Sequence, residues 1–178
     1  SRNGTSMATP HVTGTIAFIG YGMSSIIDSI WHGVPWSNSG RALIDAAIYA
    51  GPAGWPDTES RFLMRETLIV VGHPSLAATG PLAPARIAEL PLLQQSTRPY
   101  MWRQWFESLG LSVAHDMSGP RMELFSMLSE AAADGLGVAL VPPFLVEHDL
   151  AQGRLARLVD HEFRSDRSYY LIYPEPKS

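Results

Sequence analysis

Short apolar runs alternate with helix-like segments over residues 41–178, and this alternation limits the possible folds more than any other feature. The runs ETLIVVG at residues 66–72 and GVALV at residues 137–141 are short, rich in β-branched residues and bounded by Gly or Pro. Runs of this kind are typical of buried strands. Strands that alternate with helices favour an α/β fold, here with parallel-rich sheets and helices on both faces.

Two helices are expected between these runs. Thr97 is predicted to cap the first, with Pro99 in its first turn, and Gly110 to end it. Ser118 is predicted to start the second in the same way, with Pro120 just inside and Gly135 at its end. The apolar stripe of the first helix is Trp102, Trp105, Phe106 and Leu109, and that of the second is Met122, Phe125, Leu128 and Ala132.

Composition and charge exclude several classes of function. The net charge is −4, so the chain has no basic field with which to hold nucleic acid by itself. There is no cysteine, which excludes disulfides, thiolate metal sites and a cysteine nucleophile. No two histidines stand at helical ligand spacing, and no apolar run reaches about 18 residues. We expect no metal, no cofactor and no membrane segment.

Residues 4–14, GTSMATPHVTG, resemble the nucleophile motif of subtilisin-like serine proteases, with Ser6 as the serine. A serine nucleophile needs a positioned base and a group that orients the base. No Asp or His motif of that family occurs, and His11 lies about 140° around a helix from Ser6. We therefore expect no enzyme. A peptidase fragment, or an engineered chimera without a ligand, stays as the alternative.

Most of the remaining chain resembles a second family. Its strings, in order, are IDAAIY at 44–49 with Gly51 and Trp55-Pro56, RETLIVV at 65–71, Leu92-Leu93, the helix from Trp102 to Gly110, Gly119-Pro120-Arg121, AADGLGVALVP at 132–142 and YYLIYP at 169–174. In this order and spacing they resemble the effector-binding domain of LysR-type transcriptional regulators, and most of all the subgroup that regulates glycine cleavage and β-lactamase genes.

The resemblance implies a two-lobed domain of the type II periplasmic-binding-protein kind. Residues 41–62 and 160–178 would form lobe I, residues 63–159 would form lobe II, and residues 1–40 would be an atypical N-terminal segment. It also implies a cytoplasmic homo-oligomer that senses a small molecule between its lobes and switches oligomer geometry. The family binds DNA through a winged helix-turn-helix, which is not found among these residues.

The start of a helix favours anions, so a carboxylate or another anionic metabolite is the expected ligand. In this architecture ligands bind beyond the carboxyl ends of the strands. The helices expected after Thr97 and Ser118 would point their N-termini at that cleft, where a guanidinium can add a charge-assisted bond. The candidate ligand-binding residues are Thr97, Arg98, Ser118, Phe125, Ser126 and Pro142.

Overall fold

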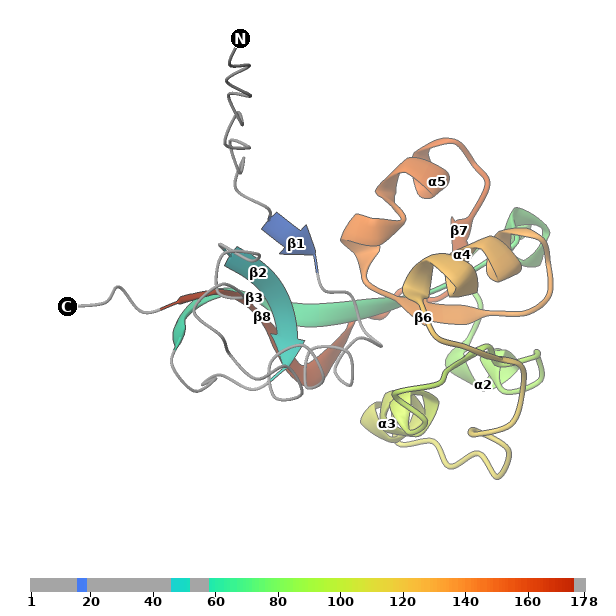
Figure 1. Cartoon of the computed structure of the whole chain (residues 1–178). Helices are drawn as coiled ribbons and strands as arrows, with labels where there is room; N and C mark the ends of the chain where they lie inside the picture. Colours follow the sequence, from blue (N-terminus) through green and yellow to red (C-terminus); the bar gives the residue numbers. More distant parts are fainter. Residues whose placement is uncertain (1–15, 19–45, 52–57, 175–178) are drawn as a thin grey trace, which may run out of the picture.

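Two long antiparallel strands run through the molecule and connect its two parts (Figure 1). The computed structural model describes residues 16–18, 46–51 and 58–174. The two long strands are β3 (Thr58–Gly72) and β8 (Phe163–Pro174). The other strands are β1 (Ile16–Phe18), β2 (Ala46–Gly51), β4 (Gln94–Gln95), β5 (Arg121–Met122), β6 (Ala139–Val141) and β7 (Ala156–Arg157).

In the described part of the chain the helices lie on one side of the molecule, and two groups of elements can be distinguished (Figure 1). They are η2 (Pro74–Ala77), α2 (Pro84–Ile87), α3 (Met101–Ser108), α4 (Phe125–Ala133), η3 (Pro143–Leu145) and α5 (Glu147–Ala151). We call residues 67–164 the helical body. The strand body consists of β1, β2, residues 58–65 of β3 and residues 168–174 of β8.

The principal sheet has the strand order β1-β2-β8-β3-β6, and β7 also pairs with β3. Among the described strands, β1–β2 and β4–β5 are parallel, whereas β2–β8, β3–β8, β3–β6 and β3–β7 are antiparallel. The expected excess of parallel pairing is therefore not confirmed. The reason is that β3 and β8 run in opposite directions and supply most of the described pairings.

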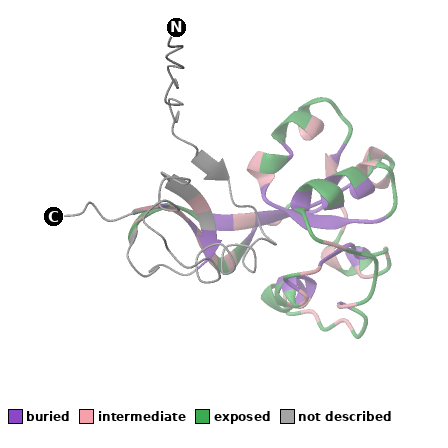
Figure 2. Ribbon diagram, viewed as in Figure 1, coloured by how far each residue is buried: buried purple, intermediate pink, exposed green. Residues whose placement is uncertain are grey.

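The core lies where β3 enters the helical body, and Figure 2 shows buried residues gathered along the middle of the sheet. Leu68 and Val71 are fully buried, and Val138 is fully buried at the bridge that leads into β6. Beside them, Trp102, Trp105 and Phe106 of α3 form a cluster in which Trp105 meets Phe106 edge-to-face at 4.9 Å between ring centroids. The burial expected at residues 137–141 is confirmed, and the strand β6 there spans Ala139–Val141.

Both predicted helix starts are wrong. The helix expected at Thr97 begins at Met101 with Tyr100 as its N-cap, and the helix expected at Ser118 begins at Phe125 with Leu124 as its N-cap. The physical reason is the proline that follows each position. The residue before a proline is disfavoured in the helical region, so Arg98 before Pro99 and Gly119 before Pro120 do not take the first helical position.

The predicted helix ends are confirmed. Gly110 and Gly135 have φ of 71° and 79° and directly follow the C-cap residues of α3 and α4. Glycine adopts this left-handed conformation at little steric cost, which is why it marks helix ends.

Several sequence predictions concern residues outside the described ranges. They include the subtilisin-like motif with Ser6 and the segment at Trp55-Pro56. Within residues 16–18, 46–51 and 58–174, none of the helices combines the length and the apolar character needed to cross a membrane.

Candidate functional site

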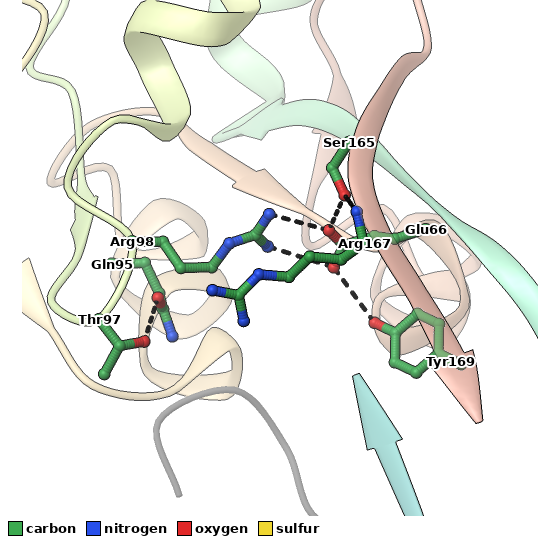
Figure 3. Close-up of polar contacts among 7 residues, drawn as sticks. All are labelled: Glu66, Gln95, Thr97, Arg98, Ser165, Arg167 and Tyr169. Carbon is green, nitrogen blue, oxygen red and sulfur yellow. Dashed lines mark hydrogen bonds and ion pairs between the residues drawn. The ribbon is translucent and has the colours of Figure 1, made fainter. Parts of the chain in front are cut away.

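A buried carboxylate lies where the crossing strands pass between the two bodies. Glu66 of β3 is fully buried, and it faces Arg98, which is 7% exposed (Figure 3). Arg98 Nη2 lies 2.9 Å from Glu66 Oε2, and Nη1 donates to Oε1 at 3.2 Å. The two side chains thus form a bidentate ion pair, the geometry that a guanidinium and a carboxylate favour.

Strand β8 supplies the other groups around Glu66. Ser165 Oγ donates to Glu66 Oε2, and the hydroxyl of Tyr169 donates to Oε1 at 3.4 Å. The backbone N–H of Arg167 donates to Ser165 Oγ at 3.1 Å, which fixes the orientation of that hydroxyl. Both carboxylate oxygens of Glu66 therefore accept hydrogen bonds from two different segments of the chain.

The electrostatics of this cluster are consistent with its burial. The guanidinium of Arg98 balances the charge of Glu66, as a buried ion requires. Burial raises the pKa of the Tyr169 phenol above its ordinary value of 10.0, and the neighbouring Glu66 carboxylate raises it further. Tyr169 is therefore a neutral hydrogen-bond donor at physiological pH.

A turn of polar residues follows β4 and carries Arg98. Gln95 is 1% exposed, and its side-chain amide donates to the carbonyl of Glu123 at 2.9 Å. Thr97 Oγ1 donates to Gln95 Oε1 at 2.8 Å (Figure 3). Gln95 thus ties the turn at Thr97 to the segment that leads into α4. The side chain of Arg167 extends from β8 towards the same turn (Figure 3).

Four of the six predicted ligand-binding residues lie on or next to the segments that Gln95 ties together. Thr97 lies exposed on the turn, and Phe125 and Ser126 are the first two residues of α4. Pro142 is buried and directly follows β6. Arg98 lies on the same turn as Thr97, and its guanidinium points inward to Glu66 rather than outward.

Ser118 lies apart from this group. It precedes β5, whereas Thr97 and Ser126 follow the carboxyl ends of β4 and β5, which run parallel. The carbonyl of Ser118 accepts a hydrogen bond of 2.8 Å from the Gln94 side chain. The backbone of Gly119 passes so close to the Leu92 carbonyl that a Cβ there would lie 2.1 Å from the oxygen. This segment therefore packs against the strand that precedes it.

Three members of the buried cluster were missed from the sequence: Glu66, Ser165 and Tyr169. One signal was available at Glu66, a single acidic residue at the start of the apolar run at residues 66–72. The polar partners were not identifiable, because Ser165 lies 99 residues further along the chain. Among the residues that the structure describes, no group of His, Asp and Glu side chains could hold a metal ion.

Comparison with known proteins identifies the family. The model of the LysR substrate binding domain matches residues 40–178, well over half of the chain. The chain belongs to this family. It is 40% identical over 120 residues to the HTH-type transcriptional regulator TrpI of Pseudomonas aeruginosa, covering 65% of this chain and 41% of the relative. It is 31% identical over 132 residues to the glycine cleavage system transcriptional activator of Escherichia coli K12, covering 72% of this chain and 43% of the relative.

Solved structures show the same fold. The effector domain of the transcriptional regulator AmpR of Pseudomonas aeruginosa superposes with a TM-score of 0.70 at 24% identity, over 93% of this chain and 87% of that one. The type II periplasmic-binding-like fold predicted from the sequence is thereby confirmed. The chain spans less than half the length of the curated relatives named here. Those relatives are transcriptional regulators, and neither they nor the family match supports the subtilisin-like interpretation of residues 4–14.

Proposed function

We propose that this chain is the ligand-sensing part of a LysR-type transcriptional regulator and that it binds a small anionic metabolite between two lobes. The family match over residues 40–178 is the observation that carries the proposal. In the proposed division, lobe I comprises residues 41–62 and 160–178 and lobe II comprises residues 63–159. The arrangement of the helical body and the strand body about β3 and β8 supports that division.

The proposed ligand site is the place where the turn at Thr97 meets the start of α4. The Gln95–Glu123 hydrogen bond holds these two segments together, and Ser126 lies exposed in the first turn of α4. Backbone N–H groups at a helix start carry partial positive charge and favour a carboxylate or phosphate. The guanidinium of Arg167 extends towards the same turn, whereas the charge of Arg98 is balanced by Glu66 (Figure 3). The ligand we propose is therefore an anion.

The proposed mechanism is a shift between conformations, without catalysis. A ligand that contacts both lobes binds one relative orientation of the lobes better than another, and it displaces the equilibrium by that difference in affinity. In a homo-oligomer the change in one subunit alters how the subunits are arranged. A DNA-binding domain attached elsewhere in the regulator would then be repositioned in the cytoplasm.

The proposal is tested by thermal unfolding against a panel of small carboxylates and phosphates. A ligand that binds only the folded chain stabilises it by RT ln(1 + [L]/Kd), which is about 2.7 kcal/mol at a hundredfold excess over Kd. We expect at least one compound to raise the Tm of the chain. We expect Ser126→Ala and Thr97→Val to reduce that shift.

The matched control is Ser112→Ala, an exposed serine in a surface hollow beside α3 that includes no residue of the proposed site. The control should keep the full shift. A panel in which no anion raises the Tm, or a shift that all three variants keep, would contradict the proposed site.

A further inference from the structure

The crossing strands lose their regular pairing between the two bodies. Phe62 pairs with Tyr170 and Met64 with Tyr169, so Leu63 is an extra residue on β3. A few positions further on, the extra residues lie on β8 instead of β3. Arg65 pairs with Ser168 and Thr67 with Arg164, so three residues of β8 lie opposite Glu66 alone.

Such bulges interrupt the ladder of backbone hydrogen bonds and bend the strand that carries them. The strand connection is therefore least regular at the junction between the two bodies. A connection of this kind bends more easily than an uninterrupted ladder. Side-chain contacts at the junction can then contribute to holding the angle between the bodies.

The Glu66 carboxylate lies at this junction and contacts both sides of it. Arg98 approaches from the turn after β4 in the helical body. Tyr169 belongs to the part of β8 that pairs with β2 in the strand body, and Ser165 lies within the bulge itself. One carboxylate thus joins the helical body, the bulge and the strand body.

Because these contacts are buried, breaking them is energetically costly. Glu66 is fully buried and Arg98 is nearly so, and separating a buried ion pair leaves an uncompensated charge away from water. A hinge movement that pulled Arg98 or Tyr169 away from Glu66 would meet that resistance. A movement that preserved the contacts would not.

We propose that Glu66 is a hinge latch, a side chain whose contacts with Arg98, Ser165 and Tyr169 fix the angle between the helical body and the strand body. The proposal concerns the chain without ligand, so it does not depend on the identity of an effector. It also connects the hinge to the turn at Thr97, because Arg98 is the next residue of that turn.

The test is a distance measurement between the two bodies by electron spin resonance. The chain contains no cysteine, so Arg61→Cys in the strand body and Glu107→Cys on α3 carry spin labels at two known positions. Both residues are exposed. In this labelled background, Glu66→Gln is expected to broaden or shift the distance distribution. Tyr169→Phe combined with Ser165→Ala is expected to broaden it as well.

The matched control is Asp116→Asn, which breaks an ion pair that lies wholly within the helical body. Asp116 is 3% exposed and meets Arg103 at 2.8 Å. The control should leave the distance distribution unchanged. An unchanged distribution in folded Glu66→Gln would overturn the proposal, as would equal broadening in the control. If Glu66→Gln does not fold, the Tyr169→Phe and Ser165→Ala double variant is the test: a broadened distance distribution supports the proposal, and an unchanged one overturns it.

Discussion

At the residue scale, Arg98 was expected to be a cation that meets a ligand, and the structure shows it meeting Glu66. The sequence alone offered no way to see this pairing, because the partners lie 32 residues apart. A surface arginine and a buried one have the same local sequence pattern. What distinguishes them is a carboxylate elsewhere in the chain that needs a counter-charge.

Arg98→Met is predicted to destabilise the chain strongly. The variant leaves the fully buried Glu66 without its counter-charge, and breaking a buried pair in this way typically costs about 3–5 kcal/mol. Urea denaturation gives the free energy of unfolding of the variant and its parent. The control is Arg154→Ala, which removes surface ion pairs with Glu130 and Asp149 and is expected to cost far less, because exposed ion pairs contribute little to stability. Equal losses in the two variants would show that the Glu66–Arg98 pair is not a buried pair in solution.

Tyr169 is predicted to make stability depend on alkaline pH. The pKa of Tyr169 is raised in the folded state. Below pH 10.0 the phenol is therefore neutral in both the folded and the unfolded states, and the free energy of unfolding does not depend on its titration. Above that pH the unfolded state loses the proton while the folded state keeps it. Folding then becomes less favourable by up to about 1.4 kcal/mol per pH unit.

The comparison with Tyr169→Phe isolates this effect, because the other tyrosines titrate equally in both proteins. At neutral pH the variant should be less stable than its parent, since it lacks the hydrogen bond to Glu66. Urea denaturation at increasing alkaline pH should show the two stabilities converging. A stability difference that stays constant through pH 10 would mean that the Tyr169 phenol is not held neutral.

At the element scale, the ends of helices were predictable and the starts were not. Gly110 and Gly135 mark ends because a positive φ is a local property of one residue. A start depends on competing local preferences, and at Thr97 and Ser118 the prolines two residues on prevailed over the capping side chains. The apolar runs at residues 66–72 and 137–141 marked the buried parts of two strands, because continuous burial leaves a continuous apolar run, but β3 begins already at Thr58 and β6 only at Ala139. Their antiparallel pairing was not predictable, since it depends on where the rest of the chain lies.

Val138→Asp is predicted to destabilise the helical body severely. Val138 is fully buried at the entry to β6, and its backbone bonds Pro91 and Leu93 on the neighbouring strand. An unpaired carboxylate at this place belongs to the changes that cost more than about 4 kcal/mol. Circular dichroism during heating measures the effect. Leu136→Asp, at a residue that is 59% exposed and lies two positions away, should shift the Tm little. A Val138→Asp variant that melts with its parent would contradict the placement of this strand.

At the scale of the whole molecule, the family and the fold could be predicted from separate strings kept in one order and spacing. The candidate site could be predicted only in part. Thr97, Phe125, Ser126 and Pro142 follow strand ends or begin a helix, and such positions converge in an α/β fold. The Glu66 cluster could not be predicted, because Ser165 lies within a bulge of β8 and no local sequence pattern indicates a bulge there.

The central claim is that a small anion binds where the turn at Thr97 meets the start of α4. Hydrogen exchange followed by mass spectrometry tests it most directly, using the carboxylate or phosphate of the panel that raises the Tm most. The account predicts slower exchange at residues 95–98 and 123–127 when that compound is present, and unchanged exchange at residues 111–117, which lie around the surface hollow beside α3. Slower exchange confined to residues 111–117, or no change at residues 95–98 and 123–127 with saturating compound, would contradict it.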